Sequence, residues 1–492
     1  MAAMELQSAS EAKLKVFIGG RWRESRSEEV REIPNPATGE LLGRVPYSTS
    51  EEVSEAVAAA AEAFHAWRAT PAIERARVLF RYKALLEDHL EELARIVTLE
   101  NGKTLAEARG EVRRGIEVVE FATGAPTLLL GEFSEDVTPG IDNEMVRAPI
   151  GVVAGLCPFN FPVMIPLWMF PIALACGNTF ILKPSERTPL AAVRLVELLE
   201  QAGLPPGVLN VVFGAQEVAE QLMEAPAVKA VSFVGSQPVA KYVYEKASRE
   251  GKRVQAMSGA KNHLIVMPDA DLDRTVDAIL ASAFGNAGER CLAASVVLAV
   301  GEVADPLVER LSKEAANLVV GDGSKADVQM GPVIRPEHKQ RILQYIEKGQ
   351  AEGAHLVVDG RSHKRITGPS TGFYLGPSIF DHVDPGMVIA REEIFGPVLS
   401  VIRVADLHEA LQILNRSQYG NAASIFTRSG SAAREFRYLA GAGMLGVNIG
   451  VAAPMAWLPF SGWKASFYGD LHATGKDAVR FYTETKVVIS RW

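Results

Sequence analysis

The sequence predicts an α/β protein with at least two domains built on parallel sheets. Three observations predict it: the chain has 492 residues, 48% of them are hydrophobic against 22% charged, and short apolar runs alternate with amphipathic stretches from Ala148 onward. A chain of this length divides into roughly two to four domains. Repeated strand–helix–strand units favour doubly wound parallel sheets, which bind ligands at the carboxyl ends of their strands.

The N-terminal part predicts hairpins followed by helices. The segments "VFIGGRWRES" and "IPNPATGELLGRVP" are typical of a hairpin-like opening, and long helices are expected from there through residue 123. Two other segments, "LLLGEFSEDVTPGIDNEMVRAP" and the C-terminal "FYTETKVVISRW", predict strands that leave the body of the protein and pair elsewhere.

Two α/β regions follow one another along the rest of the chain. In the first, the strands are "IGVVAGL", "TFILKPS", "VLNVVFG", "AVSFVGS" and "NHLIVMP", with helices starting near Pro162, Thr188, Gln216 and Pro238. The second region follows Gly259 and contains the strands "SVVLAV", "LSVIRV" and "ASIFTR". Its helices are expected at Asp271–Phe284, Asp305–Leu318, Pro336–Glu352, Leu407–Leu414 and Ser431–Leu439.

Composition argues against several classes of partner. The formal charge of −8 is spread along the chain without a basic block, so nucleic acid is not an expected partner. Three cysteines, Cys157, Cys176 and Cys291, cannot form a disulfide framework, which favours a reducing, cytoplasmic compartment. The nine histidines are scattered without a metal-binding spacing, so no metal is expected.

Neither a targeting segment nor a membrane span is expected. Residues 1–17 lack an apolar stretch behind a basic start. The segment Ile150–Leu182 carries no charge, but it contains four prolines and two asparagines and breaks into strand, helix and strand. We therefore interpret it as part of a buried α/β core.

Three short motif matches are discarded on their context. "GAGMLG" (Gly441–Gly446) follows a helix and precedes a strand, the reverse of a phosphate-binding loop, and we interpret it as a helix end and turn. "GPSTG" around Ser370 has a proline before the serine and no helix after it. "ENGKT" resembles the end of a P-loop, but Val97 stands where that loop needs its first glycine.

The motifs that remain point jointly to one reaction. "PFNFP" places Asn160 just after a strand, where its amide can donate to a developing oxyanion. "KPSERTP" places Lys183 and Glu186 at the end of the next strand, where a carboxylate can accept from the ribose hydroxyls of NAD. "FVGS", with Gly235 and Ser236, opens a helix whose N-terminal amides suit a diphosphate.

A cysteine in "FGNAGERCLAAS" completes the set. Cys291 follows Arg290 and a run of small residues, and a neighbouring positive charge can favour the thiolate. Singly, each motif also has a structural interpretation: Asn160 as a turn residue, Lys183 and Glu186 as surface charges, Phe395 as core and Gly235 as a cap. Their joint presence, with "EEIFGP" and "LPFSGWKAS", favours the functional interpretation.

Over essentially its full length the sequence resembles the aldehyde dehydrogenase superfamily. It is most similar to the coenzyme A-acylating methylmalonate-semialdehyde and malonate-semialdehyde dehydrogenases, on the motifs "KPSER", "SFVGS", "GKRVQAMSGAKNH", "MPDAD", "GERC", "EEIFGPV" and "PFSGWKASFYGDLH". The resemblance implies the aldehyde dehydrogenase fold: a Rossmann-like NAD-binding domain (1–127 and 147–258), an α/β catalytic domain (259–450) and oligomerisation strands (128–146 and 470–492). Residues 451–469 would return to the active site.

The same resemblance implies roles for individual residues. Cys291 would be the nucleophile, and Asn160 with the Cys291 N–H would hold the oxyanion while hydride leaves to the nicotinamide. Cys157 and Cys176 would be inert packing residues. The expected NAD-binding residues are Phe159, Lys183, Glu186, Gly235, Ser236, Glu393 and Phe395.

One departure from the superfamily predicts how the reaction ends. Hydrolytic aldehyde dehydrogenases usually carry a glutamate before "LGGK" that activates water, and with "SGAK" laid on that motif the position is Met257. Methionine cannot accept a proton, so water attack loses a contribution of roughly 10²–10⁴-fold. A thiol such as coenzyme A needs less help near neutral pH, so an acyl-CoA product is expected.

Charge predicts an acidic substrate. Arg290 adjoins the nucleophile, and Arg114 in "EVRRGIEVVEF" matches a subfamily position that faces the substrate, although a solvated helix face is the alternative for Arg114. Malonate or methylmalonate semialdehyde fits, and loss of CO₂ would leave acetyl-CoA or propionyl-CoA. The resemblance places such chemistry in inositol, β-alanine or valine breakdown.

Two other functions stay open at this stage. One is a hydrolytic NAD-dependent aldehyde dehydrogenase that uses another base, such as Glu289 or Glu392. The other is a non-catalytic binding or structural protein on the same fold, which the retained Cys291, Asn160 and Glu393 argue against. The family analogy also implies a homotetramer, a dimer of dimers that exchanges strands around 128–146 and at the C-terminus.

Overall fold

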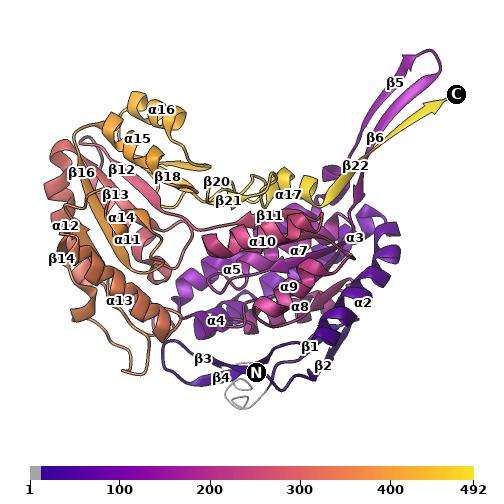
Figure 1. Ribbon diagram of the computed structural model, residues 1–492, viewed down its shortest axis with the longest axis horizontal. Helices are drawn as coiled ribbons and strands as arrows, with labels where there is room; N and C mark the ends of the chain where they lie inside the picture. The colour runs from indigo at the N-terminus through magenta and orange to yellow at the C-terminus, as the bar shows by residue number, and fades with distance from the viewer. Residues whose placement is uncertain (1–12) are drawn as a thin grey trace.

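Alternating apolar strands and amphipathic helices fold into two large sheets, which lie side by side in the computed structural model (Figure 1). The structure describes residues 13–492. The expectation about a targeting segment therefore falls mostly on residues 1–12, outside the described residues. Within the described part, no helix is long and apolar enough to cross a membrane.

The first sheet has eight strands in the order β2-β1-β9-β8-β7-β10-β11-β21. The five central strands run parallel, and β1, β2 and β21 pair antiparallel at the edges. Four of the five strands predicted for this region lie here, but the fifth, "NHLIVMP", belongs to the second sheet because it pairs with two strands there, and β11 takes its place. The strands are β1 (Val16–Ile18), β2 (Arg21–Arg23), β7 (Val152–Leu156), β8 (Thr179–Lys183), β9 (Leu209–Val211), β10 (Val228–Val234), β11 (Arg253–Met257) and β21 (Phe467–Tyr468).

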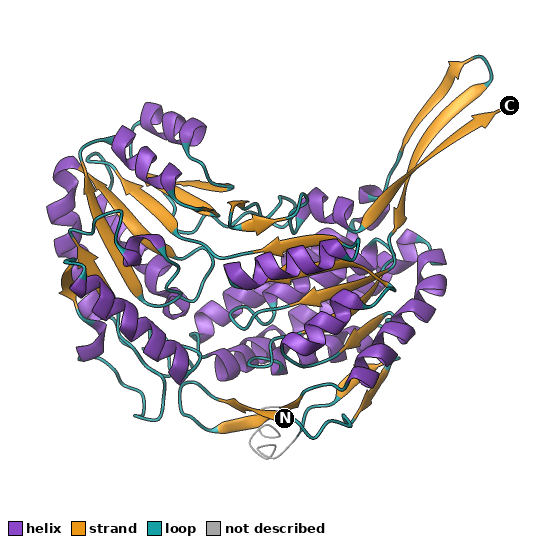
Figure 2. Cartoon of the chain, viewed as in Figure 1, coloured by secondary structure: helices purple, strands orange, loops and turns teal. Residues whose placement is uncertain are grey.

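Helices cover this sheet, and every residue of its central strands β7 and β8 is buried (Figure 2). The uncharged segment Ile150–Leu182 forms β7, α7 and β8 inside this core, as expected. The helices of this half are α2 (Ser50–Ala69), α3 (Ala72–Asp88), α4 (Leu90–Asn101), α5 (Leu105–Thr123), α6 (Ala125–Leu128), α7 (Met164–Ala175), α8 (Leu190–Gln201), α9 (Gln216–Glu224), α10 (Gln237–Arg249) and α17 (Gly475–Phe481).

The second sheet has seven strands in the order β14-β15-β16-β13-β12-β18-β19, and only β14 pairs antiparallel. Its strands are β12 (Asn262–Val266), β13 (Ala294–Val300), β14 (His355–Val358), β15 (Ser378–Asp381), β16 (Val398–Val404), β18 (Ala422–Phe426) and β19 (Met444–Val447). Its helices are α11 (Leu272–Phe284), α12 (Ala304–Asn317), α13 (Pro336–Ala351), α14 (Val388–Arg391), α15 (Leu407–Arg416) and α16 (Gly430–Leu439). "GAGMLG" does lie between a helix and a strand, after α16.

A three-stranded antiparallel sheet projects from the body, in the order β22-β6-β5 (Figure 1). It joins β5 (Glu132–Thr138) and β6 (Ile141–Pro149) to the C-terminal β22 (Thr483–Arg491), the two segments predicted to leave the body. Two small antiparallel pairs complete the fold: β3 (Val30–Pro34) with β4 (Leu41–Pro46), and β17 (Tyr419–Gly420) with β20 (Trp463–Lys464).

Candidate active site

The segment before Cys291 adopts a rare backbone conformation. Asn286, Ala287 and Gly288 are three consecutive residues with positive φ, at 50°, 51° and 74°. This region disfavours residues other than glycine, so two strained positions precede the cysteine. A Cβ atom on Gly288 would lie 2.3 Å from the Gly396 carbonyl oxygen, which explains the glycine and brings this loop against residues 393–397.

Two side-chain amides hold the backbone of Cys291 in place. Asn262 Nδ2 and Asn421 Nδ2 each donate to the Cys291 carbonyl oxygen at 2.9 Å. Asn262 also donates to the Ala293 carbonyl at 2.9 Å and accepts from the Ala422 N–H at 3.1 Å. The peptide that follows Cys291 is therefore fixed from β12 and from the loop before β18.

The Cys291 thiol lies in a mixed electrostatic environment. Burial raises the pKa of the thiol to about 12, and the Glu393 carboxylate also raises it. The N–H groups of Cys291 and Leu292 and the charge of Arg290 act in the opposite direction. Arg290 has the smallest of these effects, so in this state it does less for the thiolate than its place in the sequence suggests.

The Asn160 loop is joined to the cysteine loop. Asn160 is 4% exposed, and its Nδ2 donates to the Glu289 carbonyl at 3.0 Å. The structure thus brings Asn160 and Cys291 into neighbouring loops, and the Asn160 Oδ1 atom has no partner among the described residues.

Lys103 binds the backbone of the Asn160 loop. Its Nζ donates to the Asn160 carbonyl at 2.7 Å and to Glu111 Oε2 at 2.6 Å, and it lies 4.2 Å from the centroid of the Phe161 ring. Glu111 in turn accepts from the N–H of Val163 at 2.8 Å, just before α7. The lysine of "ENGKT" is therefore a buried structural cation.

The residues expected at the nicotinamide end of the cofactor come from loops of both sheets and contact one another. The Phe159 and Phe395 rings pack edge to face with centroids 6.0 Å apart, and Phe395 has a φ of 62°. Glu393 Oε1 accepts from the Ala260 N–H at 2.8 Å, and a Cβ atom on Gly259 would lie 2.6 Å from Glu393 Oε2. Burial raises the pKa of Glu393 to about 7.

The residues expected at the adenosine end lie at the carboxyl ends of β8 and β10. Lys183 Nζ donates to the Gly214 carbonyl at 2.7 Å, and burial lowers its pKa. Glu186 Oε1 lies 3.5 Å from Arg187 Nε. Gly235 donates to the Met257 carbonyl at 3.1 Å, and Ser236 begins α10 without a side-chain capping bond, which leaves its hydroxyl free for a ligand.

The two arginines expected to bind a substrate carboxylate are both engaged within the protein. Arg290 Nη2 donates to Glu107 Oε1 at 2.8 Å, and Arg114 Nη1 donates to Glu117 at 3.2 Å and contacts the Pro454 carbonyl through Nη2. Arg114 therefore lies between α5 and the returning segment 451–469, about a third exposed at 31%. The two guanidinium groups thus have different partners within the protein.

No carboxylate occupies the position of the usual water-activating glutamate. Met257 ends β11 and is 4% exposed. Of the alternative bases, Glu289 is fully buried and accepts from the Ile334 N–H at 3.2 Å, and burial raises its pKa to about 8. Glu392 accepts from the Tyr345 hydroxyl at 2.7 Å. Both contact α13, Glu289 through His338 at 3.4 Å and Glu392 through Tyr345.

Several groups that shape the site were not among the predicted residues. Asn262 and Asn421 hold the nucleophile's carbonyl, Lys103 holds the Asn160 loop, and His338 Nε2 lies 2.6 Å from the Phe395 carbonyl. The motif "AKNH" contained Asn262, but nothing in its spacing signals a contact with a residue 29 positions away. Within residues 13–492 no cluster of side chains could hold a metal ion.

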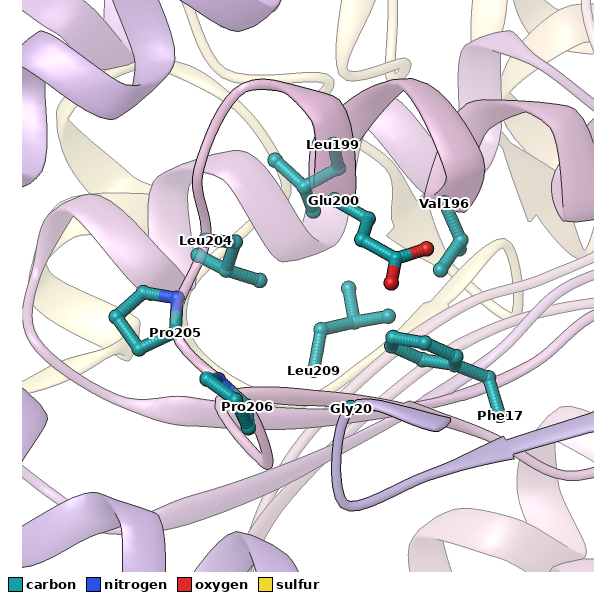
Figure 3. A pocket seen from close by; sticks show the side chains of 9 residues that line it. All are labelled: Phe17, Gly20, Val196, Leu199, Glu200, Leu204, Pro205, Pro206 and Leu209. Carbon is teal, nitrogen blue, oxygen red and sulfur yellow. The ribbon is translucent and has the colours of Figure 1, made fainter. Parts of the chain in front are cut away.

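A separate apolar pocket lies away from all of these residues (Figure 3). It is formed between β1, the turn at Gly20 and the end of α8, with the Glu200 carboxylate at its edge. Its lining contains none of the predicted site residues, so we do not assign it to the reaction.

Comparisons with known proteins show the family to which the chain belongs. The model of the aldehyde dehydrogenase family matches residues 22–488. Malonate-semialdehyde dehydrogenase 2 of Geobacillus kaustophilus is 60% identical over 479 residues, which cover 97% of this chain and 99% of that one. The malonate-semialdehyde dehydrogenase of Halalkalibacterium halodurans is 58% identical over 484 residues, covering 98% and 99% of the two chains.

Solved structures show the same likeness in three dimensions. The methylmalonate-semialdehyde dehydrogenase of Oceanimonas doudoroffii superposes with a TM-score of 0.95 at 48% identity, covering 98% of each chain. A Sinorhizobium meliloti protein, assigned as a methylmalonate-semialdehyde dehydrogenase and complexed with NAD, gives 0.96 at 46% identity, again over 98% of each chain.

Proposed function

The chain belongs to the aldehyde dehydrogenase family and is an oxidoreductase that acts on aldehydes; from this premise we propose that it oxidises malonate semialdehyde or methylmalonate semialdehyde with NAD and transfers the acyl group to coenzyme A. The names of the relatives support the substrate. The observation that carries the coenzyme A step is Met257, a buried methionine where water activation would need a base.

The residues present fit NAD. The Ser236 hydroxyl, at the start of α10, makes no capping hydrogen bond, and Glu186 lies just after the carboxyl end of β8. Gly259 has no side chain, and the Glu393 carboxylate occupies the space that a side chain would take. Phe159, Lys183, Gly235 and Phe395 would complete the binding site. Bound NAD would supply the hydride acceptor.

The chain's own groups would perform the rest of the oxidation. The Cys291 thiolate adds to the aldehyde carbon, and the Asn160 amide and the Cys291 N–H stabilise the oxyanion. The thiol must lose its proton first. Glu393, whose pKa burial raises to about 7, is the carboxylate whose charge acts on this thiol. Loss of hydride from the adduct leaves a thioester on Cys291.

The second half of the reaction transfers the acyl group. A malonyl-type thioester loses CO₂, and the coenzyme A thiolate then attacks the carbonyl carbon and releases Cys291, giving acetyl-CoA or propionyl-CoA. Arg114 would bind the substrate carboxylate, and its contact with the Pro454 carbonyl of the segment expected to return to the active site supports this role. Arg290 would serve only after its guanidinium leaves Glu107.

NADH formation tests this function against hydrolysis. With malonate semialdehyde and NAD, we expect a single turnover of NADH without coenzyme A and sustained turnover when it is added. Rapid sustained turnover to the free acid without any thiol would overturn the acyl-transfer step, and Glu393 would then be the first base to examine.

We also propose a homotetramer that works in the cytoplasm, in the breakdown of valine, inositol or β-alanine. The projecting sheet supports assembly, because β22 and β5 are unpaired edges and carry exposed apolar side chains such as Phe133, Val487 and Ile489. The three free cysteines support a reducing compartment.

A further inference from the structure

Three arginines from distant parts of the chain lie near one another, and the charges of Arg335 and Arg31 both act on Arg187. Arg187 follows β8, Arg335 precedes α13 and Arg31 lies on β3; together they are called the arginine cluster here. The Arg187 guanidinium carbon lies 5.4 Å from the centroid of the Phe159 ring. Glu186 Oε1 lies 3.5 Å from Arg187 Nε and 3.9 Å from Arg31 Nη1, and so faces both.

Two of these guanidinium groups lack acceptors. Within residues 13–492, neither Arg187 nor Arg335 donates a side-chain hydrogen bond, although the Nε atom of each is buried. Their side chains are 22% and 33% exposed, and the carboxylate nearest to Arg335, that of Glu337, is 3.9 Å away. A buried guanidinium Nε without a hydrogen-bond acceptor is costly for the fold unless a ligand supplies one.

The cluster is also electrostatically unbalanced. Burial lowers the pKa of Arg187, the charges of Arg335 and Arg31 lower it further, and Glu186 opposes them. The charges of Arg187 and Arg335 also act to lower the pKa of His338 and that of the buried Glu289, which lies two residues before Cys291. The excess positive charge therefore lies between Glu186 and the nucleophile loop.

A ligand with several phosphates fits this arrangement, because guanidinium groups bind phosphate oxygens in pairs. NAD and coenzyme A both carry a diphosphate. In NAD the cationic nicotinamide ring offsets part of that charge, and the start of α10 already offers a diphosphate site. Coenzyme A carries a further 3′-phosphate and no cation, so it needs more positive charge.

We propose that Arg187 and Arg335, assisted by Arg31, bind the phosphates of coenzyme A during acyl transfer. The proposal rests on the proposed function, and it assigns coenzyme A to the same cleft as the nicotinamide cofactor. Glu186 would repel a phosphorylated ribose, so the coenzyme A ribose would sit on the arginine side of Glu186 rather than in the NAD ribose position.

Kinetics with two thiols tests the proposal. Pantetheine carries the reactive thiol of coenzyme A without its phosphates. For wild type, Arg187→Gln, Arg335→Gln and the double variant, the ratio of kcat/KM for coenzyme A to that for pantetheine is measured, with the KM for NAD. We expect each single variant to lower this ratio at least tenfold, and the double variant further. Arg249→Gln, an exposed arginine at the end of α10, is the matched control.

Each outcome decides between occupants. A rise in the KM for NAD with an unchanged thiol ratio would assign the cluster to NAD and overturn the proposal, and so would an equal loss with both thiols. Failure of the proposed function is distinguishable, because wild type would then form free acid at the same rate with either thiol or none. If the glutamine variants do not fold, Arg187→Lys and Arg335→Lys keep the charge but lose the paired donors, and the ratio must still fall.

Discussion

The Cys291 carbonyl receives two side-chain amides, which fix the peptide between Cys291 and Leu292. With its carbonyl held by Asn262 and Asn421, this peptide presents the Leu292 N–H to the sulfur, one of the groups that lower the thiol's pKa. Donation to the carbonyl also strengthens the N–H as a donor. The amides thus act on the thiolate through the backbone.

Asn421→Leu removes one of these donors at similar volume. We expect the pKa of the Cys291 thiol to rise and kcat to fall by roughly tenfold, since a buried carbonyl loses a hydrogen bond. The rate of alkylation by iodoacetamide as a function of pH measures the thiol directly. Asn317→Leu, at an exposed position on α12, is the control. An unchanged alkylation profile in Asn421→Leu would show that the carbonyl contact is only structural.

Glu289→Gln tests the protonation of the buried carboxyl behind the nucleophile. Because burial raises the pKa of Glu289 from 4.5 to about 8, folding favours its protonated form, and this advantage is lost as pH rises from about 5 through 8. Wild type should therefore lose on the order of a few kcal/mol of unfolding free energy relative to Glu289→Gln over that range. Melting temperatures of both proteins at pH 5.5 and 8.5 measure it, and a constant difference would contradict the shift.

At this scale the sequence pointed to candidate reacting groups but not to the groups that position them. Cys291, Asn160, Glu393 and Phe395 stand in motifs, and the structure brings their loops together. Asn262 and Asn421 act through a backbone carbonyl across two strands, which no local spacing encodes. The pairing of Arg290 with Glu107 depends on how α5 packs, and adjacency to Cys291 suggested a different partner.

At the scale of elements, the Asn160 loop depends on a buried ion pair between Lys103, in the turn between α4 and α5, and Glu111 on α5. Lys103 and Glu111 are 1% and 0% exposed, and between them they bind the Asn160 carbonyl and the first amides of α7. The pair therefore joins the start of α5 to the strand-to-helix turn that presents Asn160. Such a pair fixes geometry more than it adds stability.

Lys103→Met leaves Glu111 buried without its partner. We expect a loss of about 3–5 kcal/mol in unfolding free energy and a fall in kcat, because the Asn160 loop loses its support. Lys83→Met breaks a surface pair with Glu87 at 3.1 Å and should cost less than about 1 kcal/mol. Thermal melts and NADH assays on both variants make the comparison. Equal losses would mean that the buried pair has no special role.

The sequence pattern predicted most of the helices and strands, but it did not predict the residues at which the helices begin and end. The helix expected at Ser431–Leu439 begins at Gly430 because Ser429 caps it, and the helix expected at Leu407–Leu414 continues to Arg416. Periodicity locates an apolar face, whereas capping contacts set where a helix stops. The "ENGKT" pattern likewise did not indicate the structural role of Lys103, because the partners of Lys103 lie outside the motif, on α5 and in the loop before α7.

At the scale of the whole molecule, the projecting sheet exposes apolar side chains that nothing else in the described chain covers. Val487 and Ile489 on β22 are 65% and 69% exposed, and they share a face because they are two residues apart in a strand. The sequence predicted that these strands leave the body. It gave no physical signal of the surface that would cover them.

Val487→Glu with Ile489→Glu tests whether a second copy covers this face. We expect the assembly to shift toward smaller species, because burying two carboxylates in an apolar interface is unfavourable. Analytical ultracentrifugation measures the mass, and Ile73→Glu, at an exposed apolar residue on α3 (49% exposed), is the control. An assembly as stable as wild type would exclude this face from the interface.

The central claim is that the thioester on Cys291 is resolved by a thiol, because Met257 denies water a general base. Mass analysis of the products formed from malonate semialdehyde, NAD and coenzyme A tests it most directly. The account predicts acetyl-CoA and CO₂ in amounts equal to the NADH formed. Malonate or acetate as the main product, with coenzyme A left unmodified, would contradict it.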